Sequence, residues 1–335
     1  MKQFRYERPF SLESGDNLGQ LDIAYDTYGE LNPEQTNVVW ICHHLTASSD
    51  AALWWDGMVG PVKFFDPAKY FIVCANILGS CYGTTGPLSI NPATQSPYYN
   101  SFPLVTIRDM VNAHILLRNH LGIRKIKLLV GGSMGGYQAL EWSVMEPEVI
   151  DNMVLLSTSG AESAWGIAIH TAQRMAIEAD ASWGESRADA AAKGLKAARA
   201  IGLISYRNHG ILVSKQSDSD QNKLENFKAS SYMQYQGDKL VKRFNAYSYW
   251  TLTKAMDTHN LSRGRNASTA EVLKKIEQRT LVFGIHSDIL CPVAEQLFLS
   301  NHIPDSRLIM IDSGYGHDGF MVEAELISQY LEEWI

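Results

Sequence analysis

Residues 127–142 read KLLVGGSMGGYQALEW, a stretch in which a short apolar run ends at Ser133 and a helical pattern begins. Two glycines precede the serine and two follow Met134, so residues 131–135 fit the pattern G-x-S-x-G. Between a strand (126–130) and a helix (about 134–146), this pattern predicts a tight turn that projects the serine hydroxyl from the C-terminal edge of a sheet. The alternative is an incidental serine in a glycine-rich turn, but the flanking strand, the helix and the fourth glycine favour a nucleophile.

Short continuous apolar runs on either side of this stretch predict strands that are buried on both faces. The six runs are NVVWIC (37–42), YFIVCA (70–75), IKLLV (126–130), NMVLLS (152–157), TLVFGI (280–285) and RLIMID (307–312). Segments with helical spacing lie between or after them, at 107–122, 291–303 and 320–335. This alternation predicts an α/β fold with a mostly parallel sheet covered by helices on both faces. Near the start, residues 19–31 alternate apolar and polar side chains, as half-buried antiparallel strands do.

Residues 161–265 interrupt the alternation of strand and helix. The region is rich in Ala, Lys, Ser and aromatic residues, and it shows helical spacing but no convincing buried strand. We therefore predict a helical insertion over the strand ends, called the cap below, and a core domain formed by residues 1–160 and 266–335. Within the cap, QSDSDQN (216–222) is expected to be an exposed loop.

A serine hydroxyl at its normal pKa is a poor nucleophile, so a base and an orienting acid are needed. In proteins with this kind of turn, the acid and then the histidine follow the serine along the chain. Asp288 lies just beyond the apolar run 280–285 and is the predicted acid. Asp312 and Asp318 are the alternatives, and we interpret them as a strand-end turn residue and a solvated loop residue.

The predicted base is His317, in the glycine-flanked segment DSGYGHDGF beyond the last apolar run. The 29 residues from Asp288 to His317 accommodate one helix and one strand, as the predicted topology requires. His286 is the nearest rival, but it precedes the acid, which favours a structural role.

Two backbone amides are candidates for the oxyanion hole. The amide of Met134, at a helix N-terminus, would point at an oxyanion formed on the attacked carbonyl. The second donor is expected in the loop after an early strand, where ICHHLTASSDA (41–51) places Leu45. His43 and His44 in this loop also suggest a metal site, but adjacent loop residues rarely ligate one ion together and no third ligand is suitably spaced. We predict no metal.

Composition and charge restrict the class of protein. The formal net charge of −7 argues against a nucleic-acid or anionic-membrane partner. The N-terminal segment has no signal-like apolar run and no stretch is long enough to span a membrane, so we expect a cytoplasmic protein. The four cysteines show no CxxC spacing and suggest neither zinc nor a disulfide framework. Cys42 and Cys74 lie in apolar runs and are expected to be inert buried thiols.

Several stretches resemble the homoserine O-acetyltransferase family, whose members are acyltransferases with the α/β-hydrolase fold. The matching segments span roughly residues 20–330, cap included. They are FPLVTIRDMVNAHILLRNHLGI, GGSMGGYQALEW, NILGSCYGTTGP, AARAIGLISYR, SYMQYQGDKLVKRF and DSGYGHDGF.

The resemblance implies a ping-pong reaction in methionine biosynthesis. Ser133 would take an acyl group from acetyl-CoA, a substrate and not a bound cofactor, and pass it to the hydroxyl of L-homoserine. The family resemblance also implies that Arg199 and Tyr206 in the cap hold the carboxylate of the amino acid and that Asp318 holds its ammonium group. Bidentate pairing of a guanidinium with a carboxylate makes this chemically sound. The resemblance further implies a homodimer that associates through the cap.

The chain departs from the family pattern in GPVKFF (60–65), in HHLTAS, at Tyr137 beside the serine turn, and at Gly166 and His170 in the cap. These departures leave the acyl donor and the acceptor open, because succinyl-CoA users and serine acylators look similar. A serine ester hydrolase with the same three residues is a further alternative, and a non-catalytic interaction protein is another. The arginine, tyrosine and aspartate of the amino-acid clamp favour the transferase, because a hydrolase of neutral esters would not need them.

Overall fold

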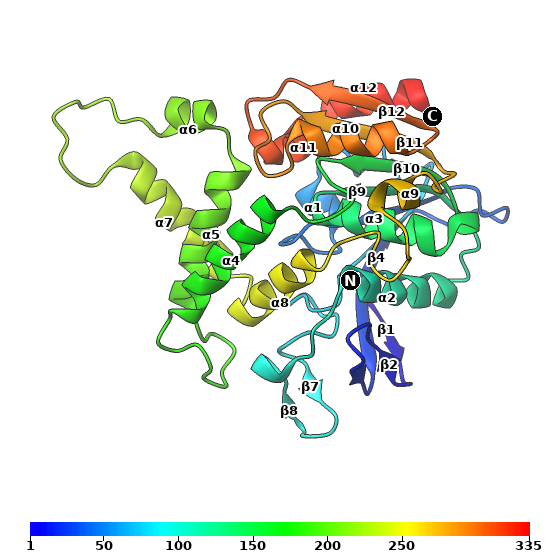
Figure 1. Cartoon of the computed structure of the whole chain (residues 1–335), viewed down its shortest axis with the longest axis horizontal. Coiled ribbons are helices and arrows are strands. Elements are labelled where there is room, and N and C mark those ends of the chain that lie inside the picture. The colour runs from blue at the N-terminus through cyan, green and yellow to red at the C-terminus, as the bar shows by residue number, and fades with distance from the viewer.

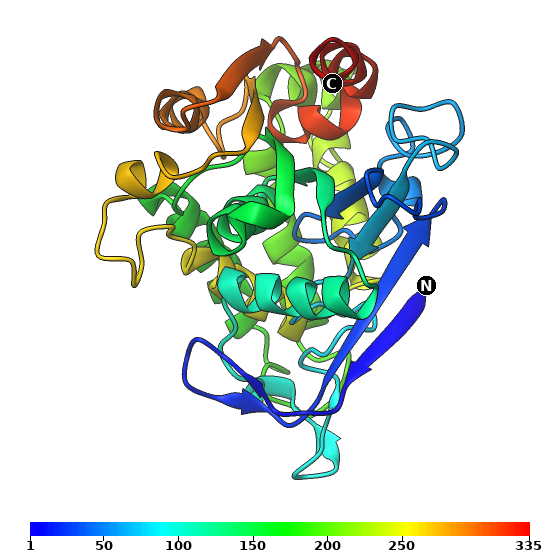
Figure 2. The ribbon, with the colours of Figure 1, turned by 90° about the vertical axis from the view of Figure 1, so that its right-hand side faces the viewer.

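The computed structural model describes all residues, Met1–Ile335, and its centre is an eight-stranded sheet in the order β1-β4-β6-β5-β9-β10-β11-β12 (Figures 1 and 2). The strands of this sheet are β1 (Lys2–Tyr6), β4 (Leu21–Tyr28), β5 (Val38–Cys42), β6 (Phe71–Ala75), β9 (Ile126–Gly132), β10 (Ile150–Leu156), β11 (Arg279–Ile285) and β12 (Ser306–Ile311). β1, β4 and β6 pair antiparallel at one edge, and all pairings from β6 to β12 are parallel. The six apolar runs are therefore all strands, and the alternating segment contains the antiparallel β4, as predicted.

Helices cover both faces of the sheet, which confirms the predicted α/β class. Successive side chains of a strand point to opposite faces, so Trp40 of β5 joins one buried cluster while Val39 and Ile41 join the other. The cluster that holds Trp40 includes residues of α2 (Ile107–His120), α3 (Met134–Met145), α9 (Thr269–Leu273) and α10 (Val293–His302). The opposite cluster includes residues of α1 (Ala51–Trp54), α11 (Gly319–Val322) and α12 (Ala324–Trp334).

The helix predicted at 107–122 begins and ends for identifiable reasons. Thr106 and Asp109 form a capping box, in which the Thr106 hydroxyl accepts from the Asp109 amide and the Asp109 carboxylate accepts from the Thr106 amide. The helix ends before Gly122, whose φ of +68° is the left-handed conformation that glycine adopts without a steric penalty. This helix packs against α3, which carries the serine turn at its N-terminus.

Helices are the main regular elements of the region predicted as the cap. They are α4 (Ala164–Glu178), α5 (Ala192–Tyr206), α6 (His209–Gln216), α7 (Lys228–Val241) and α8 (Ala246–Asp257). An isolated bridge between Ala161 and Asn260 joins the two ends of this segment where it leaves the core. In Figure 1, α4 to α7 extend to one side of the sheet, and residues 217–227 form a mostly exposed loop at the end of the α6–α7 arm.

Some elements differ from the prediction. The strand β12 is the edge of the sheet, so its side chains alternate in burial and the prediction of two buried faces was wrong for it. The N-terminal β1 was not anticipated, because its polar side chains carry no apolar run. The last helical segment is broken at Glu323 into α11 and α12. Two small hairpins also lie outside the main sheet, β2 (Phe10–Ser11) with β3 (Asn17–Leu18) and β7 (Ile90–Asn91) with β8 (Ser96–Pro97).

Candidate active site

Ser133 lies in a strained turn between β9 and α3. Its backbone has φ 54° and ψ −126°, a conformation that costs energy for a residue with a side chain. The Ser133 amide donates to the Leu156 carbonyl at 2.9 Å and the Thr158 hydroxyl donates to the Ser133 carbonyl at 2.9 Å, so the neighbouring strand end holds the turn in place. The strain is therefore sustained by surrounding contacts, as is common where a side chain is positioned for chemistry.

The glycines around Ser133 are required by close approaches between backbone segments. A Cβ atom on Gly131 would lie 2.1 Å from the carbonyl oxygen of Gly135, and one on Gly135 would lie 2.1 Å from the carbonyl oxygen of Cys42. Both contacts are with backbone atoms, which cannot move aside as a flexible side chain can. The sequence pattern thus reflects the packing of the turn against β5 and against itself.

Three side chains from separate loops meet at this turn. The Ser133 hydroxyl is 2.8 Å from Nε2 of His317, and Nδ1 of His317 is 2.7 Å from Oδ2 of Asp288. All three residues are buried, with relative exposures of 8% for Ser133, 4% for His317 and 4% for Asp288. A nucleophile, a base and an orienting acid in this chain of hydrogen bonds are the geometry of acyl-transfer catalysis.

The loop after β11 fixes the carboxylate of Asp288. Its other oxygen, Oδ1, accepts from the amides of Leu290 at 2.8 Å and Cys291 at 2.9 Å. The Ser287 hydroxyl binds both the Ser313 carbonyl and the Gly316 amide, which ties the acid loop to the histidine loop. The sequence does not predict this role of Ser287, because a serine beside a strand end has no distinctive pattern.

The alternative acid and base lie elsewhere. Asp312 is almost fully exposed at the end of β12, and its carboxylate is 3.8 Å from the ring of His286, which is also exposed. Asp318 is buried instead of solvated, and its carboxylate is 3.1 Å from Nε of Arg207. Neither of these carboxylates hydrogen-bonds to the His317 ring.

The environment of His317 shifts its proton affinity. Burial disfavours the imidazolium, but the charge and hydrogen bond of Asp288 more than offset this effect, so the pKa of His317 lies above its ordinary value of 6.5. A general base must be neutral to accept a proton.

We therefore expect acylation of Ser133 to slow as the pH is lowered through this raised pKa. The reason is that protonation at low pH removes the acceptor lone pair from Nε2. A pH profile of Ser133 acylation by an acyl thioester measures this effect, and the midpoint of its acid limb should lie above 6.5. A midpoint below the ordinary histidine value would contradict the assignment of the base.

The two amides predicted for an oxyanion hole are both available. The Met134 amide is the first of α3, and the first amides of a helix have no partner within it. The Leu45 amide forms no hydrogen bond within the protein. The loop that carries Leu45 is held close to the turn, since the Gln138 side chain of α3 donates to the His43 carbonyl at 3.1 Å.

His43 and His44 do not act together. Nδ1 of His43 is 2.8 Å from the His44 carbonyl, and its Nε2 accepts from the Ile77 amide at 3.2 Å, which defines a neutral ring. Burial lowers the pKa of His43 to about 4 and that of His44 to about 3. The ring of His44 packs edge-on against Trp54 and Phe320. No group of three or more His, Cys, Asp or Glu side chains is arranged to hold a metal ion.

The three predicted clamp residues come from both parts of the fold, Arg199 and Tyr206 from the cap and Asp318 from the core loop that carries His317. The Tyr206 ring centroid is 6.1 Å from that of His317, and the Arg199 guanidinium lies over the Tyr206 ring at 5.6 Å. Arg199 is half-buried, yet it forms no hydrogen bond or ion pair with any residue of the protein. Burial raises the pKa of Asp318, and Arg207 and His317 oppose this shift. Arg207, which is the direct partner of Asp318, was not anticipated.

Three of the departures from the family pattern converge on one buried carboxylate, Glu162. The Tyr137 hydroxyl donates to Glu162 at 3.0 Å, and the His170 ring lies 4.0 Å from it. A Cβ atom on Gly166 would lie 1.9 Å from Oε1 of Glu162, so the glycine leaves room for the carboxylate. His170 also contacts Asp257 at 2.9 Å, which links the start of the cap to its end. These three departures therefore form one connected cluster beside the serine turn.

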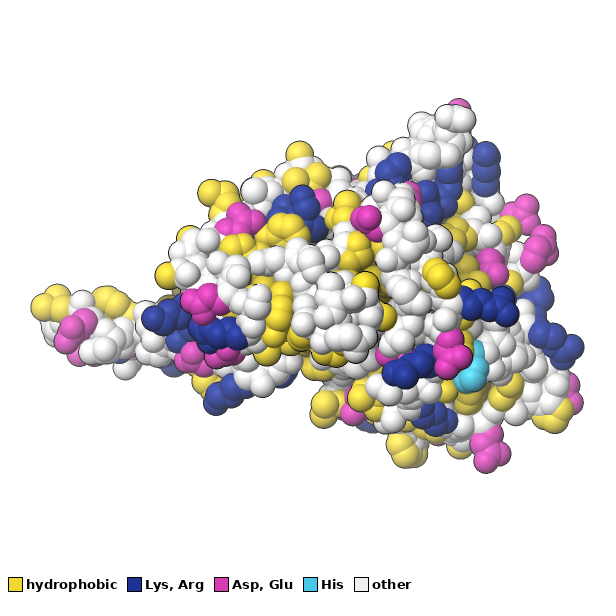
Figure 3. Space-filling model, turned by 90° about the horizontal axis from the view of Figure 1, so that it is seen from below, with side chains coloured by type: hydrophobic (Ala, Val, Ile, Leu, Met, Phe, Trp, Pro, Cys, Tyr) yellow, Lys and Arg dark blue, Asp and Glu magenta, His cyan; other side chains and the backbone are white.

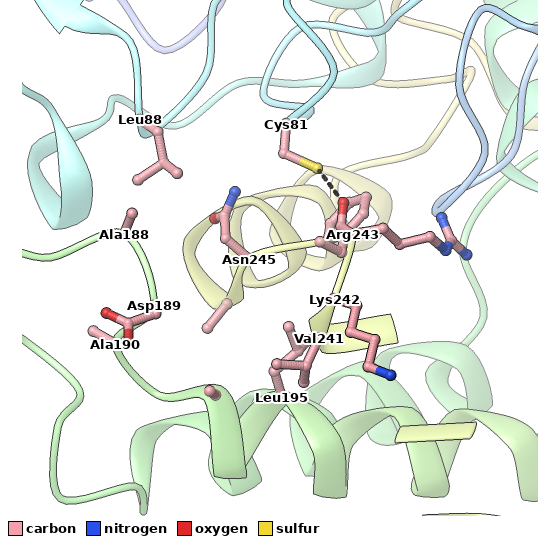
Figure 4. A pocket seen from close by; sticks show the side chains of 13 residues that line it. Cys81, Leu88, Ala188, Asp189, Ala190, Leu195, Val241, Lys242, Arg243 and Asn245 are labelled. Atoms are coloured by element: carbon pink, nitrogen blue, oxygen red, sulfur yellow. Dashed lines mark hydrogen bonds between the residues drawn. The ribbon is translucent and has the colours of Figure 1, made fainter. Parts of the chain in front are cut away.

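A cavity of about 330 Å³ opens between the cap and the core (Figure 4). Leu88 lines it from a core loop and Asp189 from the cap, while the Arg243 side chain points away from the other lining residues and bonds to the Thr46 carbonyl. None of Ser133, Asp288 and His317 lines this cavity, so it is separate from the three-residue site.

The sheet order, the strained serine turn and the order of the three residues along the chain define a protein of the α/β-hydrolase fold. A sequence model of the alpha/beta hydrolase fold matches residues 37–324. The homoserine O-acetyltransferase of Cyclobacterium marinum is 44% identical over 331 residues, which cover 99% of this chain and 94% of that protein. This chain belongs to the homoserine O-acetyltransferase family.

Solved structures show the same architecture. The homoserine O-acetyltransferase from Bacillus anthracis aligns with a TM-score of 0.90 at 25% identity, covering 99% of this chain and 96% of that one. An acetylester hydrolase from Corynebacterium glutamicum aligns with a TM-score of 0.88 at 23% identity over 99% of this chain and 95% of that one. The fold alone therefore does not separate a transferase from a hydrolase.

Proposed function

We propose that the protein transfers an acetyl group from acetyl-CoA to the hydroxyl of L-homoserine through an acyl-serine intermediate on Ser133. Membership of the homoserine O-acetyltransferase family supports the reaction class and the acceptor. The contacts between Ser133, His317 and Asp288 support the mechanism.

In the first half-reaction, Oγ of Ser133 attacks the thioester carbonyl while Nε2 of His317 takes the hydroxyl proton. The amides of Met134 and Leu45 donate to the oxyanion that develops on the carbonyl oxygen. The carbon–sulfur bond then breaks, the thiol of CoA leaves with the proton from His317, and an acetyl ester of Ser133 remains. Asp288 keeps Nδ1–H of the ring in place and stabilises the transient imidazolium.

In the second half-reaction, the hydroxyl of homoserine occupies the position that the thiol has left. His317 removes its proton, the hydroxyl oxygen attacks the acetyl ester, and the same two amides bind the second oxyanion. Collapse of this intermediate releases O-acetylhomoserine, and the proton returns from His317 to Ser133. The protein ends in its starting state.

The observation that carries the choice of an amino-acid acceptor is the unpaired guanidinium of Arg199. A half-buried arginine without a carboxylate partner beside a catalytic histidine is suited to bind an anion, and a guanidinium matches a carboxylate in bidentate geometry. A hydrolase acting on neutral esters has no use for such a group. The Tyr206 ring is close to both this arginine and the His317 ring and would orient the bound amino acid.

The test is a competition read by mass spectrometry. Homoserine and serine are offered together with acetyl-CoA and succinyl-CoA, and the products are identified by mass. O-acetylhomoserine as the main product supports the proposal. Succinylated homoserine would mean that succinyl-CoA is the donor, and acetylated serine would mean that serine is the acceptor. Free acid and free CoA alone would mean that the protein is a hydrolase.

Replacing Arg199 with alanine is expected to raise the KM for homoserine by about 10- to 100-fold, the usual cost of losing a hydrogen bond to a charged group. Slow hydrolysis of acetyl-CoA should remain detectable, because Ser133, His317 and Asp288 are untouched. Lys193→Ala, on the exposed face of the same helix, is the control and should leave this KM unchanged. Unchanged transfer in Arg199→Ala would show that the guanidinium does not bind the acceptor.

We further propose a homodimer that associates through the cap, in a cytoplasmic enzyme of methionine biosynthesis. Large apolar side chains are exposed along the cap, at Trp165, Ile167, Met175, Ile204, Val213, Leu224, Phe227 and Tyr235. The α6–α7 arm extends from the body and carries apolar atoms at its tip (Figure 3). Exposed patches of this kind mark protein–protein contact sites. No helix of the structure combines the length and the apolar character needed to cross a bilayer.

Light scattering should therefore report twice the chain mass of 37.4 kDa. Phe227→Asp is expected to shift the protein towards the monomer, because it places a charge in the apolar surface of the arm. Ile90→Asp, an exposed apolar residue of the β7–β8 hairpin, should leave the mass unchanged. A monomeric wild type would contradict this proposal.

A further inference from the structure

Gln173 of α4 is a buried glutamine without partners. It is 1% exposed, and neither Nε2 nor Oε1 of its carboxamide forms a hydrogen bond within the protein. Burying an amide without a partner costs free energy, and almost all buried polar groups in native proteins are hydrogen-bonded. A buried carboxamide whose two polar atoms both lack a partner therefore indicates a group that hydrogen-bonds to a ligand.

The free carboxamide lies beside the residues proposed to bind the acceptor. A Cβ atom built on Gly202 would be 2.8 Å from Nε2 of Gln173 and 3.0 Å from the hydroxyl oxygen of Tyr206. Nε2 of Gln173 and the hydroxyl oxygen of Tyr206 thus both lie next to Gly202 of α5. Gly202 provides the space, since any side chain there would collide with both.

A second unpartnered group comes from α8. Tyr249 has no exposed surface, and its hydroxyl forms no hydrogen bond within the protein. Burial raises the pKa of this tyrosine, and the side chain of Tyr206 is the nearest polar group that could engage its hydroxyl. Three helices of the cap therefore direct polar groups towards one place, with Gln173 on α4, Arg199 and Tyr206 on α5 and Tyr249 on α8.

Other buried glutamines of this chain are engaged with the backbone. Nε2 of Gln278 donates to the Pro147 carbonyl at 2.9 Å, and Nε2 of Gln296 donates to the Thr158 carbonyl at 3.0 Å. Gln173 makes neither kind of contact, although it is equally buried. Gln173 therefore makes no hydrogen bond that would hold α4 to the neighbouring helices.

We propose that Gln173 and Tyr249 bind the charged amino-acid end of the acceptor, together with Arg199 and Tyr206; this inference rests on the proposed function. A carboxamide both accepts and donates, so Oε1 can receive the ammonium group while Nε2 donates to the carboxylate. This oxygen would add a second acceptor for the ammonium beside the carboxylate of Asp318, whose Oδ2 is 3.1 Å from Nε of Arg207. The Tyr249 hydroxyl supplies a further donor to the carboxylate. These four groups together suit the charged end of a zwitterionic α-amino acid.

The test uses steady-state kinetics of the full-length enzyme with acetyl-CoA and homoserine. Gln173→Met keeps the shape of the side chain and removes both polar atoms, and Tyr249→Phe removes the hydroxyl. Each is expected to raise the KM for homoserine about tenfold or more, without a parallel rise in the KM for acetyl-CoA. Neither should lower the melting temperature, because each removes an unpaired buried polar group.

The matched control is Gln278→Met, at the far end of β11 from Ser133. It should lower the melting temperature, because the Pro147 carbonyl loses its donor, and should leave the KM for homoserine unchanged. A wild type that acetylates homoserine, with Gln173→Met and Tyr249→Phe variants whose KM for homoserine is unchanged, would overturn this inference alone. A wild type that does not transfer acetyl to homoserine would overturn the proposed function and this inference with it.

Discussion

The substitution Ser133→Ala is expected to abolish acyl transfer, lowering kcat by on the order of a millionfold, the loss seen when the nucleophile of such a triad is removed. No acyl-enzyme can form without the hydroxyl, and His317 then has no proton to accept. The fold should persist, because the hydroxyl bonds only to His317 and alanine can occupy the same backbone position.

Ser143→Ala is the matched control for this experiment. Its hydroxyl is also buried, in the helix α3 that follows the turn, but it bonds only to the Leu140 carbonyl. Release of CoA from acetyl-CoA is followed for both variants, with circular dichroism to check that they fold. An active Ser133→Ala variant would refute the mechanism.

The second large effect is expected from Asp288→Asn, which should lower kcat by about 10⁴-fold. The asparagine Oδ1 can still accept from the Leu290 and Cys291 amides, so the loop keeps its shape. The group facing His317 becomes an NH₂ donor, which cannot accept from Nδ1–H and favours the wrong tautomer. The imidazolium formed during the reaction also loses its compensating charge.

Asp312→Asn serves as the comparison, because Asp312 was the alternative acid and follows the neighbouring strand. Its side chain is 95% exposed, and we expect almost full activity. The initial rate of CoA release measures both variants. If Asp312→Asn lost activity while Asp288→Asn kept it, the assignment of the acid would be reversed.

The fold could be predicted largely from local patterns. Segments such as 38–42 and 128–130 are apolar at every position because parallel strands in this sheet are covered on both faces. The edge strand β12 was predicted as a strand for the same reason, but its burial was not, because edge position is set by the topology of the whole sheet. β1 could not be found, since it pairs with β4 through its backbone and its side chains are mostly polar.

Only some residues of the candidate site could likewise be predicted from the sequence. Ser133 is marked by the glycines of its turn, and Asp288 and His317 follow from their order after successive strands, which end at the same edge of a parallel sheet. The structure brings these three side chains into contact. Gln173 carries no such mark, because the Gly202 and Tyr206 side of its surroundings comes from another helix, α5. The pairing of Asp318 with Arg207 is also a tertiary contact, which the sequence does not mark.

The most direct test of the central claim is to capture the acyl group on the protein. The enzyme is mixed with acetyl-CoA in the absence of an acceptor, quenched in acid, and analysed as intact protein and as peptides by mass spectrometry. The expected result is one acetyl group on Ser133, which disappears when homoserine is added as O-acetylhomoserine forms. Formation of O-acetylhomoserine with no acetyl group on the protein, or with the acetyl group on another residue, would contradict it.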